Sequence, residues 1–86
     1  MKLKKQFITY DKGDEHITVS TGGSGFNGMI RGNKTAGMIV ELLKKETTRD
    51  EIVDAMFEKF DAPKEVIAAD VDKVIEKLRG IDALED

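Results

Sequence analysis

The hydrophobic pattern of this chain changes its period once, close to residue 33, and the change separates two kinds of secondary structure. Before it, short runs rich in β-branched and aromatic residues alternate in hydrophobicity, which is typical of strands. After it, apolar residues recur every three or four positions, as in helices that bury one stripe. Strands grouped before helices predict an α+β architecture, and 86 residues favour a single domain over residues 1–86.

Three strands are predicted within residues 5–31, at about 5–10, 15–20 and 26–31. A turn signal that contains Gly13 joins the first two strands, and a glycine-rich loop over residues 21–25 precedes the third. Short connections of this kind favour an antiparallel meander.

In the second predicted strand, Ile17 and Val19 alternate with His16, Thr18 and Ser20. This alternation predicts a half-buried strand with His16 in a solvated position. His16 is the only histidine and the chain has no cysteine, so a metal site or a catalytic triad would lack partners.

Three helices are predicted within residues 34–79. Asn33 or Thr35 can cap the first, and Thr48 begins a capping box with Glu51 for the second. The third covers about residues 63–79, and Gly80 is its expected stop. The predicted apolar stripes are Ala36, Ile39, Val40 and Leu43; Ile52, Val53, Met56, Phe57 and Phe60; and Ile67, Val71, Val74, Ile75 and Leu78.

No group of residues has the spacing of a catalytic site. Asp72 and Glu76 are helical neighbours that could act together as acid and base, but the interleaved Lys73 and Lys77 favour an ordinary charged solvent face. The glycine-rich loop lacks the lysine and the following helix that a phosphate-binding loop requires. We therefore expect no enzyme, no cofactor and no metal.

The net charge and the hydropathy of the chain argue against nucleic acid and membranes as binding partners. The net charge is −3, so there is no overall surplus of lysine and arginine to hold nucleic acid. No stretch approaches the roughly 20 apolar residues of a membrane span. The sequence predicts a soluble, cytoplasmic protein whose partners are peptides or proteins, with no nucleic acid and no membrane.

One surface could still bind a partner, between the third strand and the third helix. The exposed edge of a sheet can accept another strand, and Gly28 leaves room for a foreign backbone. Val71, Val74 and Leu78 could form the apolar wall opposite, with basic residues at its rim. A peptide could bind here by strand addition; a fully packed helix beside a plain edge strand is an equally good interpretation of these residues.

The order of three motifs resembles a known family. An N-x-T-A helix start lies at residues 33–36, a T-x-x-E-I start at 48–52, and a D-V-x-x-V-I-x-x-L helix at 70–78. This combination is similar to the family of pyrroloquinoline quinone biosynthesis protein D, which are precursor-peptide recognition domains for ribosomally made, modified peptides. The resemblance covers about residues 26–84. The chain departs from the family pattern at Gly32, where the family has a large apolar residue, and after the first helix.

The resemblance implies a winged helix-turn-helix-like fold without catalysis. It implies that the leader of a precursor peptide adds as a strand beside the third strand and against the third helix. It also implies presentation of that peptide to a radical SAM or other peptide-modifying enzyme. The binding residues implied are Gly28, Met29, Ile30 and Arg31, with Val71, Val74, Lys77 and Leu78 opposite.

Two alternatives remain open at this point. A winged-helix nucleic-acid-binding domain would have similar topology, with Lys73, Lys77 and Arg79 on its third helix. A structural or dimerisation domain could pair its third strand across a two-fold axis. We expect a monomer or a weak dimer.

Overall fold

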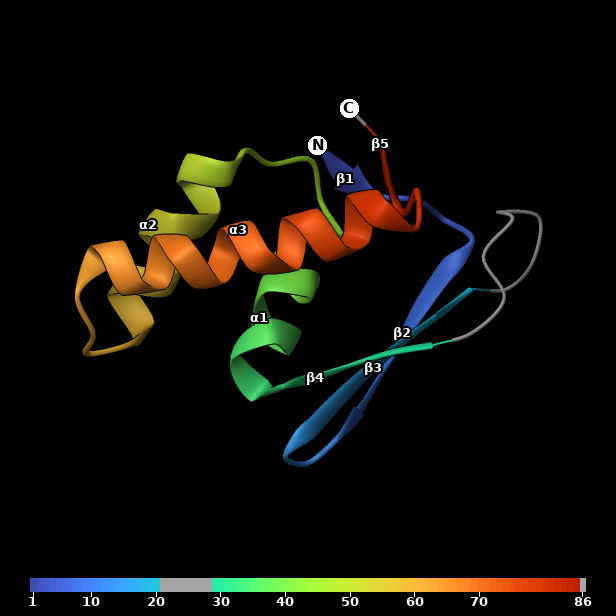
Figure 1. Ribbon diagram of the computed structural model, residues 1–86, viewed down its shortest axis with the longest axis horizontal. Helices are drawn as coiled ribbons and strands as arrows, with labels where there is room; N and C mark the ends of the chain where they lie inside the picture. Colours follow the sequence, from blue (N-terminus) through green and yellow to red (C-terminus); the bar gives the residue numbers. More distant parts are fainter. Residues whose placement is uncertain (21–28, 86) are drawn as a thin grey trace.

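The computed structural model describes residues 1–20 and 29–85, and these form the predicted α+β architecture of strands followed by helices. Helices pack on one face of a small antiparallel sheet, and the first and last strands of the described chain, residues 2–3 and 84–85, lie near one end of helix α3 (Figure 1). The elements are β1 (Lys2–Leu3), β2 (Phe7–Lys12), β3 (Glu15–Ser20), β4 (Met29–Asn33), α1 (Lys34–Leu42), α2 (Arg49–Lys59), α3 (Lys64–Gly80) and β5 (Leu84–Glu85).

Strands β2, β3 and β4 form the predicted antiparallel meander, in that spatial order. Lys12 pairs with Glu15, so the β2–β3 hairpin has a two-residue loop. Gly13 occupies its first position with φ of 78°, a conformation that glycine adopts without steric cost. The prediction that Gly13 makes this turn is confirmed.

Strand β4 leads into α1 without a separate turn. Asn33 is both the last strand residue and the helix N-cap, and its Oδ1 accepts a hydrogen bond of 2.9 Å from the backbone N–H of Ala36. Asn33, rather than Thr35, is therefore the cap. The predicted stripe of α1 is also confirmed, since Ile39, Val40 and Leu43 are buried.

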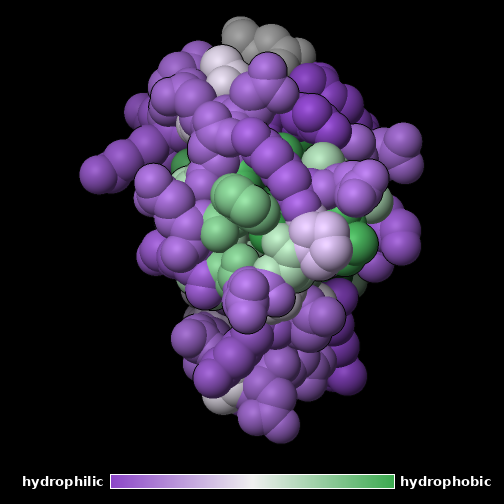
Figure 2. Space-filling model, turned by 90° about the vertical axis from the view of Figure 1, so that its left-hand side faces the viewer, coloured by the Kyte–Doolittle hydropathy of each residue, from purple (hydrophilic) through white to green (hydrophobic). Residues whose placement is uncertain are grey.

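Helix α2 begins as predicted, with Thr48 Oγ1 accepting a hydrogen bond from the N–H of Glu51. One predicted core residue of this helix is wrong: Phe57 is 45% exposed. Ile52, Val53 and Met56 already fill the buried stripe, and Phe57 follows Met56 by about 100° around the helix. Figure 2 views the end of the molecule where α2 and α3 are joined, and apolar side chains gather there inside a hydrophilic surround.

Helix α3 ends one residue later than the sequence predicts. Gly80, the expected stop, is instead the last helical residue. Asp82, with φ of 56°, takes the left-handed position beyond the helix. The N–H of Asp82 donates to the carbonyl of Arg79, and that of Ala83 to the carbonyl of Leu78. These two bonds form a Schellman motif with aspartate where glycine is usual.

The strand pair β1–β5 was not predicted. Leu3 pairs with Leu84, and both side chains are buried. The N–H of Leu3 also donates to the carbonyl of Leu43, just after α1. These two-residue strands are too short to show alternation, which is why the sequence pattern gave no signal for them.

The predicted orientation of β3 is wrong. His16 and Thr18 are 7% and 2% exposed, and their side chains share the sheet face that α1 covers. Ile17 lies on the opposite face, in register with the exposed Tyr10 and Arg31, although it is itself 6% exposed. Burial of His16 follows from tertiary packing, because a glycine of α1 lies against its ring.

Some predictions fall outside the described residues, namely the loop over 21–25 and the beginning of the third strand, including Gly28. Within the part that is described, no helix has the length and hydropathy to cross a membrane.

Candidate functional site

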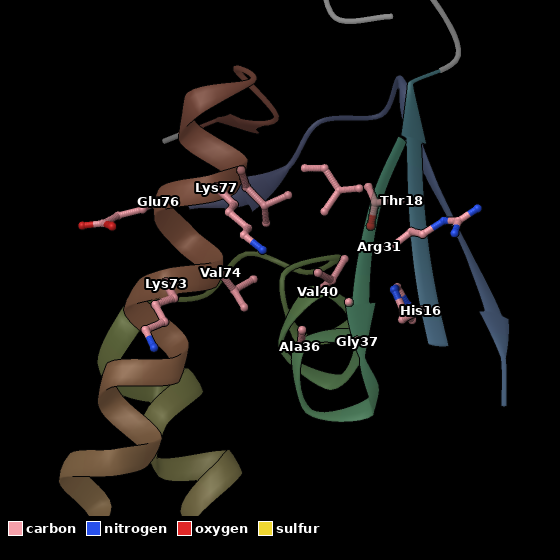
Figure 3. A pocket seen from close by; sticks show the side chains of 13 residues that line it. His16, Thr18, Arg31, Ala36, Gly37, Val40, Lys73, Val74, Glu76 and Lys77 are labelled. Atoms are coloured by element: carbon pink, nitrogen blue, oxygen red, sulfur yellow. The ribbon is translucent and has the colours of Figure 1, made fainter. Parts of the chain in front are cut away.

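A groove runs between strand β4 and helix α3, and α1 forms its floor (Figure 3). Its volume is about 400 Å³. It is lined by His16 and Thr18 of β3, Ile30, Arg31 and Gly32 of β4, Ala36, Gly37 and Val40 of α1, and Lys73, Val74, Glu76, Lys77 and Leu78 of α3. The two segments that the sequence predicts as walls of a binding surface therefore do face each other.

The interior of the groove is apolar. Val74 points into it from α3, and Val40 points up from α1 (Figure 3). Ile30 contributes from β4 and is only partly buried. Leu78 lines the base of the groove but is 1% exposed. A ligand side chain that enters here would contact Val40, Val74 and Ile30.

Val71 occupies a different place from the one expected of it. Its side chain is completely buried in the core, and it is not among the residues that line the groove. Val71 lies about one turn before Val74, on the face of α3 that packs inward with Ile67 and Ile75. It supports the helix and is not accessible to a ligand.

Two predicted residues of β4 point away from the groove. Register pairs Met29 with Val19 and Arg31 with Ile17, so both side chains lie on the outer face of the sheet. Met29 is 52% exposed, and the Arg31 side chain extends away from the groove, where its Nε lies 3.2 Å from Oε1 of Glu15 (Figure 3). Their backbone, rather than their side chains, borders the site.

Two glycines allow the floor of the groove to approach the sheet. A Cβ atom on Gly37 would lie 2.6 Å from Cβ and Cγ of His16. A Cβ atom on Gly32 would lie 2.8 Å from Cβ of Ala36. Both distances are shorter than non-bonded carbon atoms tolerate. Glycine at position 32 thus lets the strand pass directly over the first turn of α1.

A polar network fixes His16 in this wall. Oε2 of Glu41 accepts a hydrogen bond of 3.1 Å from Thr9 Oγ1 and lies 3.3 Å from His16 Nε2. Nζ of Lys44 lies 2.8 Å from the same oxygen. The Lys44 ammonium lowers the pKa of Glu41, with help from His16 and Thr9, although partial burial acts in the opposite direction. The carboxylate therefore remains ionised beside the sheet.

The rim on the α3 side carries charge. Lys77 points into the groove and Glu76 points away from it (Figure 3). Asp72, on another side of the helix, binds Arg49 through two hydrogen bonds of 2.9 and 3.0 Å, and this guanidinium lowers the pKa of Asp72. Asp72 and Glu76 are both exposed, as the predicted solvent face requires.

Strand β4 is the last strand in the order β2–β3–β4, and nothing within residues 1–20 and 29–85 pairs with its other edge. An edge of this kind presents backbone N–H and C=O groups that can pair with another strand. In the described ranges, no cluster of three or more histidine, cysteine or acidic residues could hold a metal ion. The chemistry of the site is that of backbone pairing beside an apolar groove.

Sequence reasoning found β4, Val74, Lys77 and Leu78 but missed the floor and the rear wall: His16, Thr18, Ala36, Gly37 and Val40. Ala36 and Val40 were assigned only to a core stripe. The one usable signal was the glycine at position 37 on the apolar side of the first helix, which indicates a close approach to another element.

Comparison with solved structures gives a close match in fold. The structure described as "TbiB1 in Complex with the TbiA(beta) Leader Peptide" matches with a TM-score of 0.80 over 99% of this chain and 95% of that chain, at 19% sequence identity. No curated protein sequence matches this chain.

The profile of one protein family, described as coenzyme PQQ synthesis protein D, matches residues 15–84. The match extends from the start of β3 to the start of β5 and so includes every element that forms the groove. This chain therefore belongs to the PqqD family.

Proposed function

We propose that this protein is a non-catalytic peptide-binding module that recognises the leader of a ribosomally made precursor peptide by strand addition. The single observation that carries the proposal is the groove itself, an apolar trough of about 400 Å³ beside an unpaired edge in the described part of the sheet. Strand addition uses both features, since backbone bonds supply affinity and side-chain pockets supply specificity.

In this proposal the ligand pairs with the edge of β4. Alternate side chains of an added strand point to opposite faces of the sheet. One set enters the groove between Ile30, Val40 and Val74, above Leu78 and beside Lys77. The other set continues the outer face next to Met29 and Arg31. Gly28, which the family resemblance adds to the binding residues, lies outside the described residues.

Two comparisons support the proposal. The family match points to a system that makes a modified peptide, and the structure with similar fold is described as a complex with a leader peptide. By analogy, the bound precursor is presented to a radical SAM or other peptide-modifying enzyme. We further propose that residues 1–86 act as one winged helix-turn-helix-like domain, with the β2–β3 hairpin in the position of the wing.

A selection followed by NMR tests the proposal. Random peptides of about ten residues, the length of a long strand, are selected by mRNA display for binding to the immobilised protein. We expect a recovered peptide to shift the backbone amide signals of β4 and of residues 74–78 in the labelled protein. Shifts confined to other surfaces would contradict the proposed site.

Val74→Glu places a charge inside the apolar groove and should weaken binding of the recovered peptide by more than about 100-fold, because an isolated buried carboxylate has no partner there. The matched control is Val66→Glu, since Val66 is 50% exposed on the same helix and does not line the groove. Equal binding by both variants would exclude this groove as the peptide site.

A winged-helix nucleic-acid binder is the second candidate, supported by the topology and by the lysines on α3. The acidic balance of the chain disfavours it, and Asp72 and Glu76 share α3 with those lysines. Binding to duplex DNA with a steep dependence on salt would favour this function over peptide recognition.

A further inference from the structure

The helical wall of the groove carries two lysines that no carboxylate neutralises within the described residues. Lys73 and Lys77 both line the groove and are exposed, and neither forms an ion pair in residues 1–20 and 29–85. Arg31, the third cation that lines it, is paired with Glu15 on the outer face of the sheet. The positive charge at the groove is therefore concentrated on α3.

The acidic side chains nearest in sequence do not neutralise these lysines, and Asp70, three residues before Lys73, forms no ion pair within the described ranges. Asp72 is bound by Arg49 through both of its carboxylate oxygens. Glu76 extends away from the groove, whereas Lys77 extends into it (Figure 3). Lys73 and Lys77 are also four residues apart on one helix, where like charges repel and weaken the helix slightly. An anion bound between them would remove that repulsion.

We propose that the peptide recognised by this groove is acidic as well as apolar, and that its carboxylates pair with Lys73 and Lys77. This inference rests on the proposed function, because it assigns a ligand chemistry to the same site. It adds that Lys73 and Lys77 select among peptides by charge, while Ile30, Val40 and Val74 select by apolar contact.

The spacing of the two lysines fits an extended ligand. Four residues of α-helix rise about 6 Å, and two residues of strand rise about 6.8 Å. Helix α3 and strand β4 run side by side along the two walls (Figures 1 and 3). Carboxylates two positions apart on a strand added to β4 therefore lie on one face of that strand, at a spacing close to the rise between the backbones of the two lysines, and the flexible lysine side chains can adjust to them. The ligand should carry Asp or Glu at that two-residue spacing, with large apolar residues at other positions of the same alternating set, so that both kinds of side chain face the groove.

The same display selection tests this inference when it is run on four proteins. These are the wild-type protein, Val74→Glu, the double variant Lys73→Gln/Lys77→Gln, and the control double variant Lys5→Gln/Lys45→Gln. The control removes two exposed lysines that do not line the groove, so its net charge changes by the same amount. The charge composition of each recovered pool is read by sequencing.

We expect the wild-type protein and the control variant to enrich peptides with both acidic and apolar residues. The Lys73→Gln/Lys77→Gln protein should enrich apolar peptides without the acidic excess. An individual acidic peptide should lose about fivefold in affinity for each lysine removed, the upper range for an exposed ion pair. Its affinity for the wild-type protein should also fall as salt is added.

The results distinguish failure of the inference from failure of the proposed function. Peptides that require Val74 but show no acidic excess, or an acidic excess that survives in Lys73→Gln/Lys77→Gln, would overturn the charge selection alone. Loss of the excess in the Lys5→Gln/Lys45→Gln control would also overturn it, because net charge would then explain the result. Recovery of no peptide, or of peptides that bind Val74→Glu equally well, would overturn the proposed function itself.

Discussion

On the two faces of the β2–β3–β4 sheet, hydrophobicity does not predict burial in the usual way. Several apolar side chains are exposed on the outer face, and two polar side chains are buried on the inner face. On the outer face, Ile8, Tyr10 and Met29 are 40%, 51% and 52% exposed. On the inner face, His16 and Thr18 are almost completely buried. The outer face is therefore the more exposed one although apolar side chains line it, Ile17 alone among these being buried, and a polar histidine and threonine share the inner face with the buried Phe7.

Packing against α1 explains this difference. Gly37 brings the helix backbone close enough to bury the His16 ring, and Glu41 supplies a hydrogen-bond partner within the same layer. A buried polar group is tolerated when its hydrogen bonds are satisfied. No buried side-chain nitrogen or oxygen among the described residues lacks a partner. Packing of the helix thus decides that the inner-face His16 and Thr18 are buried, and hydrogen bonds satisfy their polar groups.

The largest effect should come from closing the approach of α1 to the inner face. Gly37→Ala places a Cβ atom 2.6 Å from the His16 side chain, and we expect the free energy of unfolding to fall by about 1–3 kcal/mol. This steric loss of stability should exceed the gain of up to about 1 kcal/mol in stability that alanine brings over glycine in a helix interior, so the variant should be less stable than wild type. Urea denaturation measures the change.

Gly80→Ala is the matched control, because Gly80 is also helical and no atom lies within 4 Å of its added Cβ. It should leave stability unchanged or raise it by up to about 1 kcal/mol. If Gly37→Ala were as stable as Gly80→Ala, contact between α1 and His16 would not be what buries the inner face.

A smaller effect is expected from adjacent residues of β4 that point to opposite faces. Ile30 lines the groove and Met29 lies on the outer face. Ile30→Thr should weaken binding of a display-selected peptide about tenfold, since it exchanges an apolar contact of about 1.4 kcal/mol for a hydroxyl. Met29→Thr should change the affinity by less than about twofold. Both variants place threonine, a β-branched residue that suits a strand, at the substituted position.

Isothermal titration calorimetry measures both affinities, and circular dichroism checks that each variant folds. A loss for Met29→Thr as large as that for Ile30→Thr would mean that the ligand is recognised on the outer face, and the distinction between the two faces would then have to be reversed.

Local sequence chemistry predicted much of this fold. The Gly13 turn, the caps at Asn33 and Thr48 and the apolar stripe of α1 are all present, because each depends on residues close together in the chain. The predicted end of α3 was wrong because it depends on residues far apart in the chain. The left-handed residue there is Asp82, whose Schellman bonds accompany burial of Ala83 and Leu84 beside β1. That tertiary contact has no local signal.

The site was predictable only in its two walls. Strand β4 and the inner-facing Val74 could be placed from alternation and helical period, whereas Val71 could not be separated from Val74 by period alone. The floor of the groove depends on how α1 lies across the sheet. Helix α1 can lie this close only because Gly32 and Gly37 have no side chains. A glycine in the sequence indicates that another element can approach closely, but it does not show which element does so.

The smallest effect concerns the polar network of the inner face and depends on pH. The folded chain lowers the pKa of Glu41 below its ordinary value of 4.5, chiefly through Lys44, so ionisation of Glu41 stabilises the fold above that pH. The stabilisation is lost as pH falls through the lowered pKa. Since the Glu41 side chain is 51% exposed, Glu41→Gln should reduce stability at neutral pH by less than about 1 kcal/mol. The difference from wild type should vanish in acid.

Urea midpoints of both proteins, measured from neutral to acidic pH, test this expectation. Asp72→Asn is the control, because Asp72 is held by Arg49 away from the sheet and its pKa is lowered independently. In an Asp72→Asn background, Glu41→Gln should produce the same pH-dependent difference. A difference that stays constant across the pH range would show that Glu41 contributes through neutral hydrogen bonds to Thr9 and His16. The inner face would then accommodate its polar residues without the help of charge.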